Sequence, residues 1–499
     1  MNDTGALPPG APRGRLGALI AGLMREPAPL AAVERHPSHL AIVVALVCTG
    51  AFIGQLDATI VQLALPTLGR TFDAPLEAVS WVSLAYLVSF AAFLPVFGRL
   101  CQMFGRKSLY LFGYLLFGTA SALCGLASDL PQLIAFRVLQ GMGGAMLGAN
   151  SIAILVAAVD EKKRGRALGV FAAAQAVGMS AGPAVGGLVL AGLGWRWVFW
   201  LSVPFAVVAL LAGWLALPRE QATDRGQSFD WSGAALLGPA LVLLVMALNH
   251  LSAWGPTSLP VIASLGGAAA LMWLFVRRER RAVHPLVALR LFGSGAFTAG
   301  AVAVTLGYAL LYGMFFLMSF LLEHGYGDSP RAAGFRLAVI PVVLGLVAPF
   351  SGPLAERLGA ARLTACGMAG CVAALGLLWL SASMGEAGSL ARTVAFAVFG
   401  AGLGVFIAPN NHETLKAAPG PLAAPAGSLL NLMRVLGSSI GVAAGTASLS
   451  FGLDRATGVH DHWMGASGVA LVHALDPGLV TLAVLALTAG AVCLLRPRT

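Results

Sequence analysis

Apolar stretches of about 20 residues recur from Leu40 onward, separated by short segments that carry nearly all of the charge. An α-helix of this length crosses the roughly 30 Å hydrocarbon core of a bilayer. The pattern predicts an all-α membrane protein with fourteen transmembrane helices, in the order six, two, six. The predicted spans are residues 40–66, 79–100, 108–127, 130–159, 167–191, 198–217, 231–251, 259–276, 296–322, 332–354, 363–382, 393–408, 426–451 and 479–495.

This order of spans divides the chain into four parts. Residues 1–39 form a predicted N-terminal tail, and residues 40–217 a first six-helix bundle. Residues 218–295 form a linker region with two extra transmembrane helices, and residues 296–499 a second six-helix bundle. Two matched bundles are typical of transporters that rock about a central substrate site. The apolar stretch Leu16–Met24 in the tail is too short to span, so we interpret the tail as cytoplasmic, with an interfacial helix, rather than as a signal peptide.

Composition agrees with a membrane location, because 58% of the residues are apolar and 10% are charged. The net charge of +10 is spread over many short loops, so it does not indicate nucleic acid as a partner. With the N-terminus inside, the outer loops hold few of the 31 Lys and Arg residues. This asymmetry predicts that both termini are cytoplasmic in a multi-pass protein of a bacterial inner membrane. The basic residues of the outer loops are Arg70, Arg196, Arg331, Arg392 and Arg455.

Two loops share a pattern that indicates an internal repeat. After the second span, Gly98 and Arg99 are followed by Gly105 and Arg106. After the tenth span, Gly352 and Gly359 occur at the same spacing, with Glu356 and Arg357 between them. The repeat places equivalent loops in the two bundles, on the predicted cytoplasmic side.

Several further segments resemble motifs of the fourteen-span drug:proton antiporter branch of the major facilitator superfamily, and the resemblance extends from Leu40 to the end of the chain. It implies the two-bundle fold, proton-coupled export by alternating access, and gating by the two repeated loops and by the glycines of the fifth span. The matching segments are Leu56–Pro66, Gly98–Lys107, Arg137–Gly143, Trp195–Phe199, Asn431–Gly437 and the fifth-span set Gly169, Gly178, Gly182, Pro183, Gly186 and Gly187.

The chain departs from this family pattern at two positions. The first-helix motif usually has Asn where this chain has Gln62, and the loop motif usually has Asp where this chain has Gln102. The resemblance implies that the acidic residue of the loop helps to latch the cytoplasmic side. The latch of the first bundle is therefore expected to be weaker, whereas Glu356 supplies the acid in the second.

Asp57 is the only acidic residue deep inside a predicted span, and ionisable residues at this depth usually serve a function. It lies about 13 Å from the outer end of its span, and Arg137 lies about 10 Å from the outer end of another. We expect the two to interact, directly or through water, so that protonation of Asp57 alters helix packing and couples transport to protons. The alternative is a permanent structural ion pair.

Polar and aromatic residues suggest a substrate cavity between the bundles. Gln55, Thr59 and Gln62 share one face of the first helix, with Asp57 on the other, although such residues equally well form bonds between helices. Aromatic residues of the ninth helix suit a lipophilic substrate, although they also suit plain packing. The proposed cavity set is Gln55, Thr59, Gln62, Trp81, Tyr86, Gln140, Tyr308, Tyr312, Phe315 and Arg434. Residues 410–413 are interpreted as a loop after the twelfth span.

Other classes of protein fit the sequence less well. No phosphate-binding loop is present, so a primary pump is not expected, and no convergent set of nucleophile, base or metal ligands indicates an enzyme, a metal site or a cofactor. The expected partners are a small-molecule substrate, protons and the lipid bilayer, and no sequence feature indicates a nucleic acid or an accessory protein. A dedicated metabolite or lipid exporter, a proton-coupled importer and a non-transporting sensor remain alternatives.

Overall fold

The computed structural model describes residues 29–219, 229–382, 384, 388–418, 420–458 and 463–497. These residues form helices and no β-strand. Among them, 14 helices are long and apolar enough to cross a membrane, which confirms the predicted number. The backbone of such helices satisfies its own hydrogen bonds, as the hydrocarbon interior requires. The predicted interfacial helix at Leu16–Met24 lies outside the described residues.

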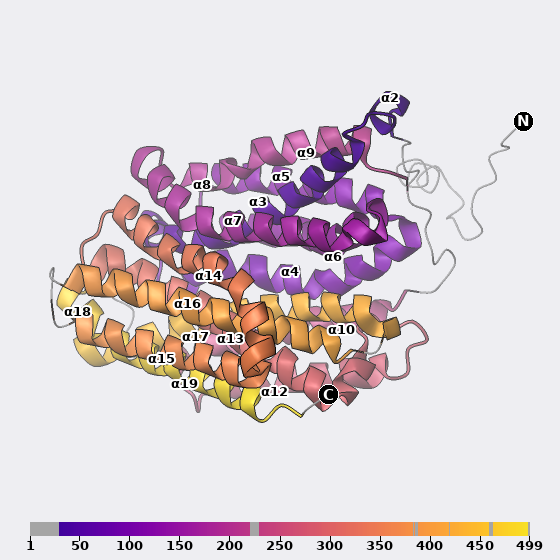
Figure 1. Ribbon diagram of the computed structural model, residues 1–499. Coiled ribbons are helices and arrows are strands. Elements are labelled where there is room, and N and C mark those ends of the chain that lie inside the picture. Colours follow the sequence, from indigo (N-terminus) through magenta and orange to yellow (C-terminus); the bar gives the residue numbers. More distant parts are fainter. Residues whose placement is uncertain are drawn as a thin grey trace, which may run out of the picture.

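The helices before the linker pack against one another as one group (Figure 1). A short helix, α2 (Ala31–Glu34), comes before this group. The group consists of α3 (His39–Phe72), α4 (Leu76–Phe104), α5 (Arg106–Leu126), α6 (Leu130–Ala158), α7 (Arg164–Gly192), α8 (Arg196–Trp200) and α9 (Ser202–Ala216).

The second group contains the helices after the linker. It consists of α13 (Gly295–Phe320), α14 (Pro330–Leu358), α15 (Ala360–Ala382), α16 (Gly388–Lys416), α17 (Ala423–Thr457), α18 (Gly468–His473) and α19 (Leu475–Leu494). The two groups meet where α7 packs on α14, α4 on α17 and α3 on α13.

The linker contributes α10 (Trp231–Asn249), α11 (Leu251–Trp254) and α12 (Leu259–Glu279). Helix α10 packs against α4 of the first group and α17 of the second. Its last residue, Asn249, is fully buried, accepts a hydrogen bond from Ser80 at 2.8 Å and donates one to the Glu77 carbonyl at 2.9 Å. The extra helices therefore attach to the side of the molecule through α4 and α17.

Local sequence signals explain where several helices begin and where the chain turns between two helices. Asp129 caps α6 by accepting a hydrogen bond from the Gln132 backbone N–H at 2.8 Å. The two repeated loops are one-residue turns, because Gly105 alone separates α4 from α5 and Gly359 alone separates α14 from α15. Their φ angles of 104° and 85° favour glycine at both positions.

Some predicted boundaries are wrong because helices continue after the apolar pattern ends. Helix α3 runs through Pro66 to Phe72, and α16 continues to Lys416. Residues 410–413 are therefore helical, which corrects the expected loop. Helix propagation does not require apolar side chains where a helix leaves the hydrocarbon, so hydropathy alone underestimates these lengths.

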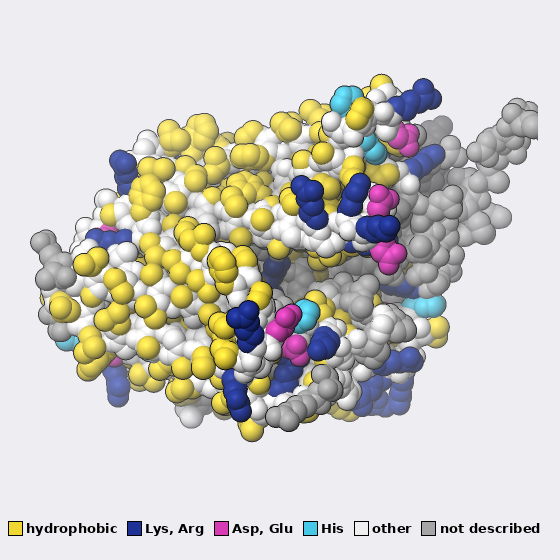
Figure 2. All heavy atoms as spheres, in the orientation of Figure 1, with side chains coloured by type: hydrophobic (Ala, Val, Ile, Leu, Met, Phe, Trp, Pro, Cys, Tyr) yellow, Lys and Arg dark blue, Asp and Glu magenta, His cyan; other side chains and the backbone are white. Residues whose placement is uncertain are grey.

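Hydrophobic side chains cover the middle of the face shown in Figure 2, and charged side chains gather towards its two ends. Most of the visible Lys and Arg side chains lie at the end where α3 begins, which we call the basic end. The end of α19 lies there as well (Figure 1). This distribution matches a protein with an apolar belt in contact with lipid.

The first testable consequence concerns the contact between α7 and α14. A Cβ atom on Gly187 would lie 2.5 Å from the Pro330 carbonyl oxygen and 3.1 Å from the Gly334 Cα. Gly187→Ala is expected to destabilise the protein by about 1–3 kcal/mol because backbone atoms cannot move aside cheaply. Thermal unfolding of the detergent-solubilised protein measures the effect.

Gly169→Ala is the matched control on the same helix, since a Cβ atom there meets nothing within 4 Å. We expect this variant to unfold at or above the wild-type temperature, because alanine favours a helix more than glycine does. Equal unfolding temperatures for the two variants would contradict the close α7–α14 packing.

Candidate functional site

Asp57 and Arg137 form a direct ion pair between α3 and α6. The Arg137 Nη1 atom lies 2.6 Å from Asp57 Oδ2, and both side chains are fully buried. Gln140, one helical turn after Arg137, donates to Asp57 Oδ1 at 2.7 Å. Both carboxylate oxygens therefore accept hydrogen bonds, and the interaction expected from the depths of the two residues is present.

The ion pair is held by two more helices. Arg137 Nε donates to the Val82 carbonyl of α4 at 2.8 Å, and Gln140 donates to Ser121 of α5 at 2.8 Å. The Arg137 guanidinium also lies 4.3 Å from the centre of the Tyr86 ring. A change of charge at Asp57 would therefore alter hydrogen bonds that join four helices of the first group, α3, α4, α5 and α6.

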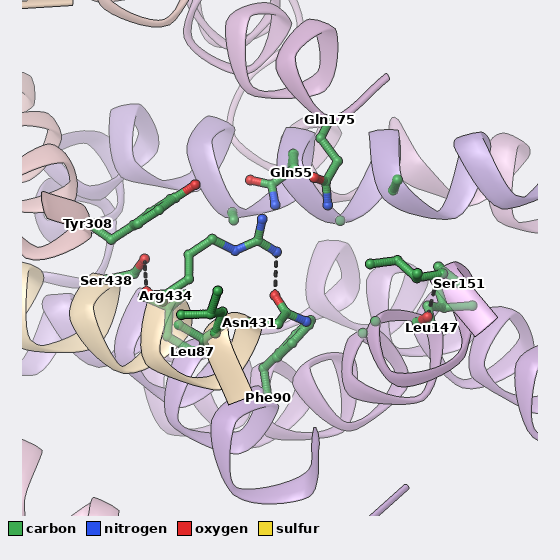
Figure 3. A pocket seen from close by; sticks show the side chains of 18 of the residues that line it. Gln55, Leu87, Phe90, Leu147, Ser151, Gln175, Tyr308, Asn431, Arg434 and Ser438 are labelled. Atoms are coloured by element: carbon green, nitrogen blue, oxygen red, sulfur yellow. Dashed lines mark hydrogen bonds between the residues drawn. The ribbon is translucent and has the colours of Figure 1, made fainter. Parts of the chain in front are cut away.

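A cavity of about 250 Å³ lies between the two helix groups. Its walls come from α3, α4, α6 and α7 on one side and from α13, α16 and α17 on the other. The lining residues of α6, α7, α16 and α17 fall in the halves of those helices nearer the basic end, as exemplified by Gln175, Asn411 and Asn431, and those of α3 and α13 lie around the middle of their helices. Figure 3 shows Arg434 reaching into the space between Gln55 and Gln175 on one side and Asn431 on the other.

The other end of the molecule is closed by close packing between the groups. Gly187 of α7 lies against Pro330 and Gly334 of α14. Nearby, Trp463 is buried, donates to the Ala74 carbonyl at 3.1 Å, and leaves a Cβ atom on Gly69 only 2.5 Å from its ring. The cavity is therefore sealed at this end by contacts between the segment before α18 and the end of α3.

The structure brings half of the proposed cavity set to the cavity and places the other half elsewhere. Arg434, Tyr308, Tyr312, Tyr86 and Gln55 line it. The residues that do not line it are Thr59, Gln62, Trp81, Gln140 and Phe315. Gln140 belongs to the ion-pair cluster, and Trp81 and Phe315 pack against the apolar core.

The face of α3 that lines the cavity differs from the face that the sequence predicted. Ala58 lines the cavity with Gln55, whereas Thr59 faces α7 and donates to the Met179 carbonyl at 3.3 Å. Gln62 lies nearer the closed end and donates to Ser83 at 2.6 Å. The prediction that Thr59 and Gln62 line the cavity is wrong, because neighbouring helices cover these positions and use them for bonds between helices, the alternative considered above.

Sequence reasoning missed several polar lining residues. Gln175 of α7 and Asn411 of α16 face the cavity, the latter from a segment expected to be a loop. Asn431 was recognised as part of a motif, and its Oδ1 accepts a hydrogen bond from Arg434 at 2.6 Å. The i, i+3 spacing of Asn431 and Arg434 is a signal that both lie on one helical face.

The fifth-span motif has two packing faces. Gly178 lies against the Phe52 backbone, Gly182 against Thr59 and Gly186 against Ile60, so this face contacts α3. Pro183 and Gly187 form the other face, which contacts α14. The motif therefore joins α3 inside the first group to α14 in the second without touching the cavity.

The repeated loops lie at the ends of α4 and α14. Gln102 accepts a hydrogen bond from Arg99 at 2.8 Å, in the position where the related motif has an acid. Gly98 has open space around it, and Arg106 opens α5. Glu356 and Arg357 are exposed, and neither forms an ion pair within the described ranges. The expected latch acid therefore makes no such contact in this conformation, in which the cavity extends towards this end.

Comparisons with known proteins agree with this architecture. Residues 47–442 match the profile of the Major Facilitator Superfamily. The chain is 30% identical to the riboflavin transporter RibZ of Clostridioides difficile over 81% of this chain and 86% of that protein. It is 32% identical to the tetracenomycin C resistance and export protein of Streptomyces glaucescens over 80% of this chain and 73% of that protein.

Among solved structures, the fold resembles a bacterial homologue of the human lysosomal transporter Spinster in an inward-facing and unoccupied conformation. The TM-score is 0.66 at 15% identity, over 92% of this chain and 97% of that chain. At this identity the likeness concerns the fold alone.

A double-mutant cycle tests the energetics of the buried pair. Arg137→Gln is expected to cost about 3–5 kcal/mol, because it leaves the Asp57 carboxylate without its cation in a water-free site. The double variant Asp57→Asn/Arg137→Gln is expected to lose much less than the sum of the two single losses. Unfolding of each variant in one detergent gives the coupling, and additive single losses would contradict a direct interaction.

Proposed function

This chain belongs to the Major Facilitator Superfamily, and we propose that it is a secondary active transporter that exports small molecules in exchange for protons. The fold, the bacterial relatives and the fourteen apolar helices fit a multi-pass protein of a bacterial inner membrane. One relative is a drug resistance and export protein, whereas another transports riboflavin. Export of lipophilic drugs or related molecules is the function that we propose, with a metabolite such as a vitamin as the second candidate.

The observation that carries the proposal is the contact of Tyr86 with both parts of the site. One face of its ring lies under the Arg137 guanidinium, and Tyr86 also lines the cavity. Asp57 itself is fully buried and does not line the cavity. A proton on Asp57 and a substrate in the cavity would thus influence each other through Arg137 and Tyr86 while they occupy different places.

Protonation of Asp57 removes the charge that balances Arg137. The guanidinium would then be left buried without its anion, a state that is costly in a low-dielectric interior. Rearrangement of α3 against α6 relieves this cost, and α3 also contacts α13 of the second group. The proton would thereby bias the equilibrium between the two orientations of the bundles.

The conformation supports export from the cytoplasm. Under the positive-inside rule, the basic end faces the cytoplasm. The cavity extends towards that end, and the opposite end is sealed by α7, α14 and Trp463. A substrate would enter from the cytoplasm in this state, and proton binding and release would accompany opening on the other side.

Proteoliposomes with a pH gradient test the role of Asp57. We expect Asp57→Asn to retain substrate binding and exchange at equal pH, but to lose most pH-driven flux, because Asn cannot gain or lose the proton. Asp160→Asn, which changes an exposed acid, is the matched control. Normal pH-driven flux in Asp57→Asn would show that protons act elsewhere.

The role of Tyr86 as a link has its own test. Tyr86→Leu removes the aromatic face under Arg137 and is expected to lower pH-driven flux more than it lowers exchange at equal pH, by roughly tenfold. Tyr86→Phe keeps the aromatic face and should retain coupling. A loss of exchange and pH-driven flux in equal proportion in Tyr86→Leu would point to a cavity role alone.

A further inference from the structure

The charge inside the cavity is carried by one residue. Of the described residues that line it, Arg434 alone is charged, and the remaining polar groups are neutral amides and hydroxyls. The described lining includes no Asp or Glu, and Asp57 lies outside it, paired with Arg137. A molecule in the cavity therefore meets a net positive site.

Two other arginines inside the predicted spans are balanced by acids. Arg137 pairs with Asp57, and Arg336 pairs with Asp328. Arg434 pairs with no carboxylate in the described part of the chain, and its guanidinium donates one hydrogen bond there, to Asn431. Since the guanidinium carries five N–H groups, most of its donors are available to a ligand.

Neutral polar groups face Arg434 across the cavity. Gln55 of α3 and Gln175 of α7 point towards the guanidinium from the opposite wall (Figure 3). Neither side-chain amide hydrogen-bonds to another described residue, and the buried Asn411 Oδ1 also lacks a partner there. These amides and the nearby guanidinium can all form hydrogen bonds with a polar ligand in the cavity.

Aromatic rings supply the remaining walls. Tyr86 and Phe90 of α4 and Tyr308 and Tyr312 of α13 line the same cavity, and the Arg434 guanidinium lies 5.7 Å from the centre of the Tyr308 ring. Flat rings of a ligand can stack on such walls, whereas flexible aliphatic chains gain less from them.

On these grounds we infer that the cavity selects planar aromatic acids, with Arg434 binding a carboxylate, phenolate or sulfonate group. Gln55, Gln175 and Asn411 would bind the neutral polar groups of the same molecule. Arginine suits this role because its planar fork donates two parallel hydrogen bonds to an oxyanion. The inference rests on the proposed function as a transporter and specifies its substrate class.

The same charge disfavours organic cations. A positive group placed within about 5 Å of Arg434 is repelled, and the low dielectric of the cavity strengthens this repulsion compared with water. We expect an anionic compound to bind roughly 10- to 100-fold more tightly than a cation built on the same ring system. This preference is a property of the cavity at equilibrium and does not require a proton gradient.

Equilibrium binding to the full chain in lipid nanodiscs tests the inference. The probes are fluorescein and rhodamine 123, which share a xanthene ring but differ in charge, together with an anthraquinone sulfonate and an anthraquinone that carries a quaternary ammonium group. We expect each anion to bind at least about tenfold more tightly than its cationic counterpart. Tighter binding of the cations, or no binding by either anion, would overturn the inference.

Variants of Arg434 test whether this residue causes the preference for anions. Arg434→Gln should weaken anion binding by about tenfold or more and abolish the preference, whereas Arg434→Lys should keep part of it. Arg455→Gln, on the exposed outer part of the same helix, is the matched control and should bind like wild type. Retention of the anion preference in a folded Arg434→Gln variant would also overturn the inference.

A second variant and a flux measurement distinguish failure of the inferred substrate class from failure of the proposed transport function. Gln175→Leu changes the opposite wall without changing the charge, so it should weaken binding of anions and keep the preference over cations. pH-driven flux of fluorescein in proteoliposomes then tests the proposed function by itself. Anion-selective binding without flux would uphold the substrate class and reject proton-coupled export, and pH-driven flux of the cations alone would reject the substrate class.

Discussion

The hydrocarbon interior of a membrane offers no partner for a polar group, and this constraint governs both the fold and the site. The backbone satisfies its hydrogen bonds within helices, so the described chain is built mainly of helices and contains no β-strand. Polar side chains inside the spans must find partners as well. Asp57, Arg137 and Gln140 do so with one another, whereas Arg434 donates among the described residues only to Asn431 and reaches into the cavity.

Lipid supplies little driving force for the association of apolar helices, so their contacts depend on close approach. The glycines of α7 provide it on two faces, towards α3 and towards α14. The contact with α14 brings the two backbones close together at the closed end of the cavity, since Gly187 lies against Pro330 and Gly334. Packing within the first group and contact between the two groups therefore depend on the same helix.

The site keeps the predicted proton-carrying group and the substrate apart. Asp57 is sealed among helices of the first group, and the cavity contains a cation and no acid among its described residues. Tyr86 touches both regions. Under the proposed function, this separation would let a proton and an anionic substrate act on the same bundle without competing for one residue, unlike an exchange at a shared carboxylate.

The sequence by itself determined the class of fold, the number of spans and two of the ionisable residues buried within them, Asp57 and Arg137. Hydropathy decides these features because transfer into hydrocarbon depends on composition and on the length of each stretch. The sequence also indicated that Asp57 and Arg137 meet, since their depths matched. The helix ends were predicted less well, as α16 shows, because propagation continues after the apolar pattern stops.

Only the tertiary structure decided which polar residues face the cavity. Thr59 and Gln62 lie on the predicted face of α3, yet neighbouring helices cover them, and Gln175 and Asn411 reach the cavity from helices that showed no comparable signal. It also decided that Arg434 has no acidic partner in the described part of the chain and is the charged residue of the described cavity lining. The periodicity of one helix specifies the relative directions of its side chains, but what each direction meets depends on how the other helices pack around it.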